Sequence, residues 1–204
     1  SGSLPNLSQQ LGHLSRTNSE SLLGVVSRTQ KVDYSLGSAI TSSVFPAPDT
    51  HIEPVRYGRG SGFMGLLQSV AASGKAGQDP TPARLLWATL TNLHRLPNFY
   101  NLRTWPQRTL ILLVMQSLDN SLITFAKRRW FGGTKVSSKQ GHGQKNPSWV
   151  PVGHSVARQL ATDIDGTAGA VIYDEGTISS CENLAPIEFV HAVVSMGSCV
   201  GNWK

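Results

Sequence analysis

One continuous apolar run, Leu110–Met115, constrains the fold of this chain more than any other feature. Every residue in it is hydrophobic, whereas a strand with one solvated face would alternate apolar and polar residues. The run therefore predicts a strand that is buried on both faces. It is far too short for a transmembrane segment, which needs about 20 apolar residues. At 204 residues, the chain is long enough to build the required core in one or two domains.

Other extended segments are shorter and are bounded by turns. Ala39–Phe45 is short and contains several β-branched residues, so we predict a strand there that ends at a turn over Pro46–Asp49. His51–Tyr57 follows as a second extended run, and the two could pair as a hairpin with a loop of about five residues. Near the C-terminal end, the segment GTAGAVIYDEG predicts a small turn and a short strand.

Three segments have apolar residues near helical spacing: Met64–Ala72, Ala83–Leu96 and, approximately, His154–Ala161. A fourth helix could begin at Ser15 or Thr17, since a short polar side chain there could cap a helix running into the apolar LLGVV stretch. The alternative for this polar region is a loop that packs on a ligand.

Charge, cysteine content and the first residues narrow the class of protein. The net charge of +6 would suit an acidic partner, but it bears on solubility and encounter rather than on fold. Cys181 and Cys199 have neither C-x-x-C spacing nor paired histidines nearby, so we predict no metal site and no disulfide scaffold. The start of the sequence lacks the order of a signal peptide, which makes a cytoplasmic location the default expectation.

Much of the basic charge lies in one segment, Phe125–Lys145, where it is interleaved with Trp130 and Phe131. Such a mixture could bind nucleic acid through phosphate contacts and base stacking. The spacing is loose and rich in glycine, however, which favours a solvated hairpin. We therefore predict a hairpin here and no nucleic-acid partner.

Gly60, Gly62 and Gly65 spell a Gly-x-Gly-x-x-Gly pattern. A dinucleotide-binding turn needs a buried parallel strand before it and an acidic residue about 20 positions beyond it. The preceding run, HIEPVRY, is polar and contains proline, and Asp79 lies in a turn-rich segment. We interpret the glycines as a tight connection into a helix.

Glu53 is the strongest candidate for chemistry. Side chains alternate along an extended segment, so His51, Glu53 and Tyr57 share one face and Arg56 lies on the other, where it is not expected to pair with Glu53. An unpaired carboxylate on a half-buried strand would have a raised pKa, as a general base near neutral pH requires. The alternative is a solvated glutamate on an edge strand. Pro54 favours an edge position, because proline cannot donate to an interior ladder.

Four separated blocks carry a family resemblance: AITSSVF, THIEPVRYGRGSGFMGLLQSV, RTLILLVMQSLDNSL and QGHGQKNPSWVPVGHSVARQLA. Over about residues 5–175, the chain resembles the interior of a glucose-methanol-choline (GMC) oxidoreductase of the cholesterol oxidase-like branch. The resemblance implies an α+β fold, with a mixed or antiparallel sheet flanked by helices and no complete dinucleotide-binding domain. Residues 1–175 would form a substrate-domain-like region, and residues 176–204 a divergent or truncated tail.

The resemblance also implies roles for three residues. Glu53 is similar to the carboxylate that the family places over the sterol ring as a general base. Asn18 matches a family segment that lies near the flavin. His191 can be compared with the family's active-site histidine, although the Gly-Gly that follows this histidine in the family is absent here.

The function implied by the resemblance is that of an FAD-dependent oxidoreductase. It would oxidise a secondary alcohol, such as the 3-hydroxyl group of a sterol, and could then move a proton between ring carbons. Its partners would be an apolar sterol-like substrate and the flavin-binding part of the same protein, and we expect the isolated chain to be inactive. A second hypothesis is a non-catalytic basic binding module that keeps the substrate-domain fold.

Overall fold

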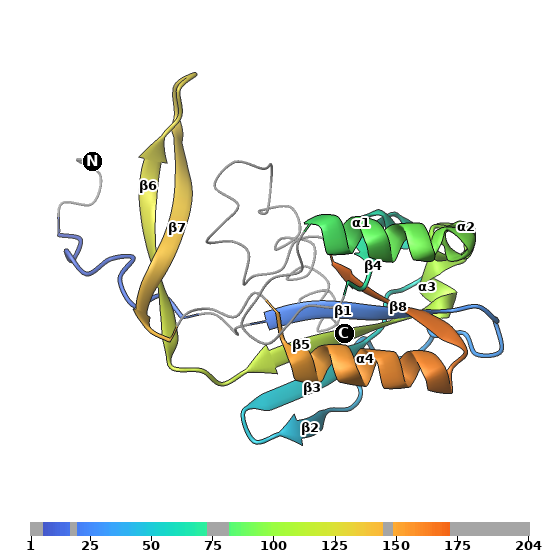
Figure 1. Ribbon diagram of the computed structural model, residues 1–204. Coiled ribbons are helices and arrows are strands. Elements are labelled where there is room, and N and C mark those ends of the chain that lie inside the picture. Colours follow the sequence, from blue (N-terminus) through green and yellow to red (C-terminus); the bar gives the residue numbers. More distant parts are fainter. Residues whose placement is uncertain (1–5, 17–19, 73–81, 145–148, 172–204) are drawn as a thin grey trace.

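An antiparallel six-stranded sheet forms the body of the computed structural model, which describes residues 6–16, 20–72, 82–144 and 149–171 (Figure 1). The strand order is β2-β3-β5-β1-β8-β4, and every pairing within this sheet is antiparallel. The antiparallel sheet expected for an α+β fold is confirmed. The strands are β1 (Glu20–Ser27), β2 (Val44–Ala47), β3 (Thr50–Val55), β4 (Gln68–Val70), β5 (Thr109–Gln116) and β8 (Gly166–Val171).

Helices pack on both faces of this sheet (Figure 1), which agrees with the expectation of a sheet flanked by helices. One face is covered by α4, and part of the other by short helices that follow β3 and precede β5. Among the described residues, no helix combines the length and apolar character needed to span a membrane. The helices are the 3-10 helix η1 (Gly62–Leu67), α1 (Pro82–Thr91), the 3-10 helix η2 (Leu93–Arg95), α2 (Leu96–Phe99), α3 (Trp105–Arg108) and α4 (Pro151–Asp163).

β5 is the strand predicted from the continuous apolar run, and the prediction that it is buried on both faces is confirmed in part, because Ile111, Leu112 and Val114 are buried while Leu113 and Met115 are half-buried. Leu112 and Val114 belong to the core cluster beneath α4. Ile111 belongs to the cluster on the opposite face, with Phe99 and Trp105. Because the strand lies between β3 and β1, neither of its edges faces solvent, and its side chains bind the two layers of helices to the sheet.

The prediction of a helix that starts at Ser15 or Thr17 is wrong. The LLGVV stretch belongs to β1, which pairs with β5 on one side and β8 on the other. Ser15 forms an isolated bridge with Leu122, and Thr17 lies outside the described residues. Packing against two distant strands therefore outweighs the local capping signal.

The hairpin predicted from the two extended runs is confirmed, but with different bounds. β2 covers Val44–Ala47 rather than Ala39–Phe45, and Ile40 forms only an isolated bridge. The turn is correspondingly tighter than predicted, at Pro48–Asp49. The short strand predicted within GTAGAVIYDEG is confirmed as β8.

β3 is an interior strand, so the edge position predicted from Pro54 is wrong. It pairs with β2 on one side and with β5 on the other. The proline is tolerated because the pairing with β2 extends only as far as Ile52, and Pro54 lies beyond it. A proline therefore marks the end of a neighbouring strand here rather than the edge of the sheet.

The predicted helix Met64–Ala72 is also wrong, since η1 ends at Leu67 and β4 follows at once. The glycines in this region permit close packing. A Cβ atom on Gly62 would lie 1.9 Å from the carbonyl oxygen of Leu102, and one on Gly65 would lie 2.7 Å from the Trp105 ring. The interpretation of the glycine pattern as a connection is confirmed, although it leads into a 3-10 helix and an edge strand.

The remaining helices follow their predictions in part. The helix predicted over Ala83–Leu96 ends at Thr91, and η2 and α2 continue the chain. The helix predicted at about His154–Ala161 is confirmed inside the longer α4. Nothing in the fold tests the predicted division into residues 1–175 and 176–204, because residues after 171 lie outside the described part of the chain.

The predicted basic hairpin is confirmed as β6 (Asn120–Arg128) and β7 (Thr134–Gly143). These strands form a separate two-stranded sheet. Figure 1 shows this ribbon projecting away from the main sheet.

His154 is a buried histidine on α4. Its side chain is 5% exposed, and its ring centroid lies 5.2 Å from that of Trp149. Burial and, to a smaller extent, the positive charge of Arg158 together lower the pKa of His154 to about 4. The folded protein therefore keeps this histidine neutral under mildly acidic conditions in which an unfolded chain would protonate it.

We expect this histidine to make stability depend on pH. Its folded pKa is depressed, so its stabilising contribution is complete above pH 6.5 and is lost progressively as the pH falls towards 4. The loss between pH 7 and pH 4.5 should be about 2–3 kcal/mol. Urea unfolding at the two pH values measures it. His154→Gln should remove this part of the pH dependence, and equal pH dependence in both proteins would contradict the assignment.

Candidate functional site

Six half-buried side chains lie together on one face of the sheet, at the end where β1 begins. Residues directly opposite one another in paired strands project to the same face, and two such rows cross β3, β5 and β1. We call the six residues the Glu53 surface. It consists of Glu53, Leu113 and Leu22 in one row and His51, Met115 and Glu20 in the next.

Glu53 is paired within this surface, so the prediction of an unpaired carboxylate is wrong. Its Oε1 lies 3.4 Å from Nε2 of His51, and the two side chains are 23% and 31% exposed. His51 stacks flat on Phe45, with ring centroids 4.6 Å apart. The predicted separation from Arg56 is confirmed, since its guanidinium donates to the carbonyl of Leu36. The stacked histidine restricts where the Glu53 carboxylate can point.

Nε2 of His51 is buried and has no hydrogen-bond partner within the described ranges. At 3.4 Å it lies within ion-pair distance of Glu53 without making a hydrogen bond. A small movement of either side chain would bring Nε2 within hydrogen-bonding distance and geometry of the carboxylate. The pair therefore provides a carboxylate with an adjacent group that can orient it during proton transfer.

An apolar floor formed by Leu22, Leu113 and Met115 lies beside this carboxylate. Leu22 and Tyr57 pack against the cluster that contains Val26 and Trp105. Burial raises the pKa of Tyr57, and the negative charge of Glu20 raises it further. Both effects favour the protonated phenol. A few polar groups around an apolar floor are typical of sites for small apolar ligands.

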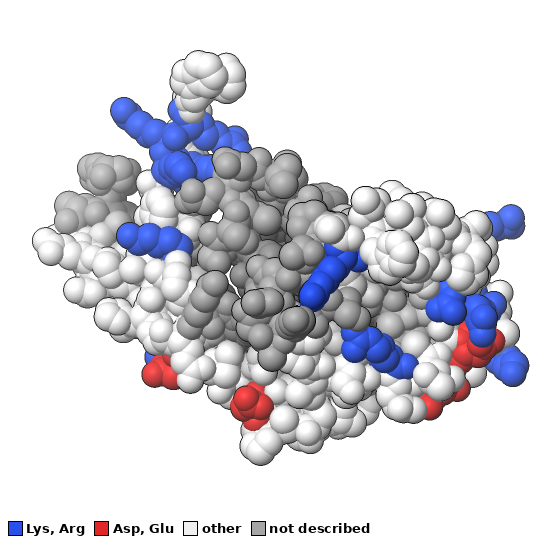
Figure 2. All heavy atoms as spheres, in the orientation of Figure 1, with Lys and Arg blue, Asp and Glu red and all other residues white. Residues whose placement is uncertain are grey.

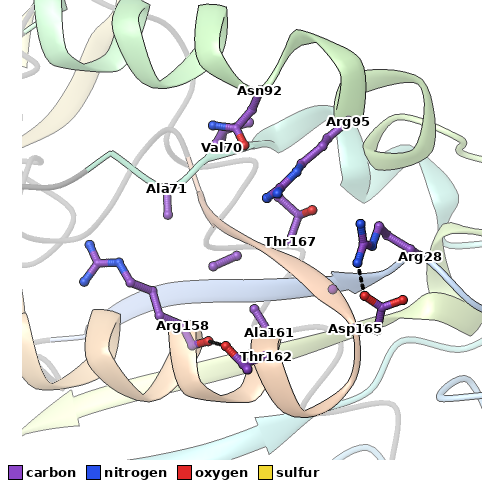
Figure 3. Close-up of a pocket in the computed structure, with 12 residues that line it drawn as sticks. Arg28, Val70, Ala71, Asn92, Arg95, Arg158, Ala161, Thr162, Asp165 and Thr167 are labelled. Atoms are coloured by element: carbon purple, nitrogen blue, oxygen red, sulfur yellow. Dashed lines mark hydrogen bonds and ion pairs between the residues drawn. The ribbon is translucent and has the colours of Figure 1, made fainter.

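A cavity lies at the opposite end of β1 from the Glu53 surface. Its volume is about 480 Å³, and Figure 3 shows it between α4, β8 and the helices that follow α1. Three arginines line it: Arg28, Arg95 and Arg158. Its polar, cationic lining suits an anion better than a sterol, so this cavity is not our candidate site for an apolar ligand.

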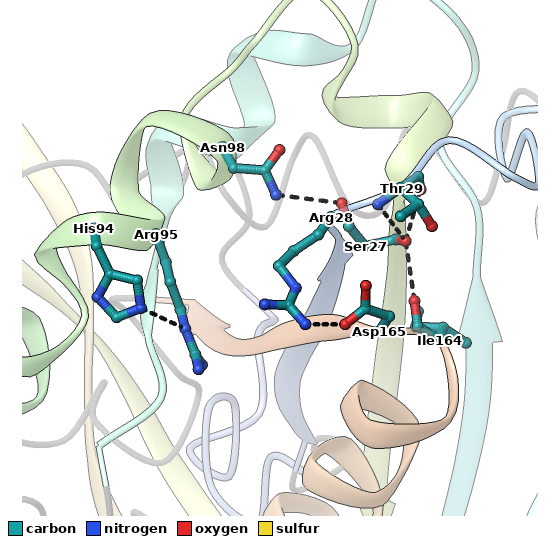
Figure 4. A network of polar contacts seen from close by, with 8 residues as sticks. All are labelled: Ser27, Arg28, Thr29, His94, Arg95, Asn98, Ile164 and Asp165. Carbon is teal, nitrogen blue, oxygen red and sulfur yellow. Dashed lines mark hydrogen bonds and ion pairs between the residues drawn. The ribbon is translucent and has the colours of Figure 1, made fainter.

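The polar network beside this cavity joins the ends of several elements (Figure 4). Arg28 forms an ion pair with Asp165, and the Ser27 hydroxyl contacts the carbonyl of Ile164 at 3.0 Å. Nε of Arg95 donates to Nε2 of His94 at 3.2 Å. The contacts of Arg28 and Ser27 tie the end of β1 to the loop between α4 and β8, whereas the Arg95–His94 contact lies within η2, and we interpret all three as structural.

Of the three site residues predicted from the sequence, the structure describes only Glu53. Glu53 lies on the surface described above, whereas Asn18 and His191 lie outside the described residues, so their roles remain predictions. No group of three or more potential metal ligands occurs in the described ranges. The sequence assigns no role to His51, although strand alternation places it on the face of Glu53. The sequence around Glu20 gives no indication that this residue belongs to the same surface.

Comparisons with known proteins identify the relatives of this chain. No protein-family model matches it, and no solved structure does. Cholesterol oxidases from two strains of Mycobacterium tuberculosis are 50% identical to it over 173 residues, and a cholesterol oxidase from Acinetobacter baumannii is 40% identical over 171 residues. These alignments cover 82% and 81% of this chain but only 30% of each relative's length. The chain is therefore homologous to a segment of the cholesterol oxidases, in agreement with the resemblance to the cholesterol oxidase-like GMC branch.

Proposed function

We propose that this chain supplies the sterol-binding sheet of a sterol oxidoreductase, and that Glu53 moves a proton on the bound steroid. The observation that carries the proposal is the Glu53 surface, where a half-buried carboxylate stands beside an apolar floor. The homology to cholesterol oxidases supports a sterol as the ligand. The rings of the steroid would lie on Leu22, Leu113 and Met115.

The proton transfer needs only residues of this surface. In a steroid with a 3-keto group and a 5,6 double bond, Glu53 would take a proton from the carbon between the two groups. The electrons move into the carbonyl, forming a dienolate. Glu53 then returns the proton to the far end of the double-bond system, which leaves the conjugated 4-ene and the original carboxylate. His51 would act as a positioning residue, because it lies 3.4 Å from Glu53.

FAD is our proposal for the cofactor of the whole protein, because cholesterol oxidases are generally flavoproteins. The described residues do not themselves fit a dinucleotide. The glycine pattern that could form a phosphate cradle is packed against Leu102 and Trp105, with no room for a ligand at Gly62 or Gly65. We therefore derive no oxidation step from these residues. Asn18, near the flavin, and His191, as a catalytic residue, remain part of the proposal for the whole protein.

The alternative function is a non-catalytic basic module that keeps this fold. The net charge of +6 and the cavity lined by three arginines support it. Such a module would have no requirement for the apolar floor beside Glu53. Sterol binding, and its location on the protein, therefore separate the two functions.

Leu113→Lys is expected to weaken sterol binding by at least about tenfold, because it places a charge in the apolar floor. The measurement is a titration of the 204-residue protein with a fluorescent sterol. Leu86→Lys is the matched control, since Leu86 is an exposed residue of α1, and it should bind as the unmodified protein does. Equal affinities of the two variants, or no sterol binding by the unmodified protein, would favour the basic module. Melting temperatures of the two variants check that both are folded.

A further inference from the structure

The tip of the β6–β7 hairpin exposes two neighbouring aromatic side chains. Trp130 and Phe131 are each 93% exposed, and their ring centroids lie 5.1 Å apart. Scattered exposed apolar residues are ordinary, but two large adjacent rings at the end of a projecting ribbon form a compact apolar point. The rings contact each other and together present one convex surface.

The hairpin carries positive charge beside this tip and has no acidic residue within its own sequence. No Asp or Glu occurs between residues 120 and 143. Figure 2 shows the Lys and Arg atoms gathered on the hairpin, with uncharged atoms beyond them at the tip. Five cationic residues belong to the hairpin: Lys127, Arg128, Arg129, Lys135 and Lys139.

The outer part of the hairpin lacks a third strand in the described structure. Its base is joined to the N-terminal segment, where Ser15 bridges Leu122 and the amide of Thr124 donates to the carbonyl of Gly12. From Phe125 onward, the described pairings join β6 only to β7. An isolated two-stranded ribbon is marginally stable in water. A partner surface would therefore stabilise this part of the chain.

We propose that the hairpin docks on the surface of an anionic lipid bilayer. Trp130 and Phe131 would enter the interfacial layer, which aromatic side chains favour. The five cationic residues would lie over the lipid phosphates, where each Lys or Arg is attracted to the negative surface potential. This proposal stands on the hairpin alone and does not depend on the chemistry proposed for Glu53.

The shape of the tip favours a bilayer over two other partners. Binding to single-stranded nucleic acid uses aromatic side chains spaced so that successive bases can stack on them, whereas the rings of Trp130 and Phe131 lie against each other at an interplanar angle of 36°. A protein partner would need a pocket that fits this convex point. A bilayer interface deforms around it and supplies both the apolar layer and the negative charge.

The test is co-sedimentation of the 204-residue protein with vesicles of phosphatidylcholine alone or mixed with phosphatidylglycerol. We expect binding to the anionic vesicles, weakened by salt. The double variant Trp130→Ala/Phe131→Ala should bind them at least about tenfold more weakly. The triple variant Lys127→Gln/Arg128→Gln/Arg129→Gln should lose a similar or larger factor. The exchange Trp130→Phe/Phe131→Trp should retain binding.

Trp87→Ala is the matched control, because Trp87 is an exposed tryptophan on α1, and it should bind vesicles as the unmodified protein does. Three results would overturn the proposal. The first is no binding of the unmodified protein to anionic vesicles. The second is equal binding by the double variant. The third is binding to single-stranded DNA as tight as to vesicles, with the same dependence on Trp130 and Phe131.

Discussion

Glu53→Gln is expected to slow the isomerisation of a 3-keto-5-ene steroid by about 10²–10⁴-fold, the usual contribution of a positioned general base. Glutamine keeps the size and polarity of the side chain but cannot accept and return the proton. The steroid should still bind, because the apolar floor formed by Leu22, Leu113 and Met115 is unchanged. The variant therefore separates proton transfer from binding.

The measurement supplies the ketosteroid directly, so that no oxidation precedes it. It is made in a chimera in which this chain replaces the segment that it matches in the Mycobacterium tuberculosis cholesterol oxidase. Glu20→Gln is the control, because Glu20 is the other carboxylate of the Glu53 surface. It should keep most of the rate. A large loss in Glu20→Gln with little change in Glu53→Gln would assign the base to Glu20 instead.

Arg108→Met is expected to lower the free energy of unfolding by about 3–5 kcal/mol, because it strips partners from a buried polar network. Arg108 is 4% exposed, and burial lowers the pKa of its guanidinium. Its Nη1 donates to the carbonyl of Ser27 at 3.1 Å and to Oδ1 of Asn98. Its Nη2 donates to the carbonyl of Asn98 at 2.8 Å, and its Nε to Oγ1 of Thr104 at 2.9 Å.

These bonds join the end of β1 to α2 and to the residue before α3. Methionine would fill much of the volume but would leave the carbonyls of Ser27 and Asn98 without this donor. Arg129→Met is the matched control, because Arg129 is an exposed residue beside the hairpin tip, and such substitutions usually change stability by less than about 0.5 kcal/mol. Urea unfolding at pH 7 measures both variants. Equal effects would show that the Arg108 network does not stabilise the fold.

The elements that the sequence predicts well are those with a strong local pattern. The apolar run Leu110–Met115 predicts β5, because a strand of this composition needs burial on both faces. The basic, glycine-containing segment predicts the β6–β7 hairpin. β1 has no such signal, since its polar start suggests a helix cap. It becomes a strand by pairing with β5 and β8, which lie far away in the sequence.

The candidate site likewise combines features that the local sequence predicts with features that depend on pairing between distant strands. The alternation of side chains along a strand is enough to place His51 and Glu53 on one face, and the 3.4 Å contact agrees with it. The rest of the Glu53 surface depends on register, because Glu20 joins it only through the pairing of β1 with β5. The interior position of β3 is also a tertiary property. Pro54 favours an edge strand locally, while β2 covers only the part of β3 before it.

Whether a steroid lies on the Glu53 surface can be decided by a crystal structure of this chain with a bound 3-keto steroid. We expect the rings to lie over Leu22, Leu113 and Met115, with the Glu53 carboxylate facing the carbons that exchange the proton. A steroid bound elsewhere, such as in the cavity lined by Arg28, Arg95 and Arg158, with the Glu53 surface bare, would contradict the proposed function.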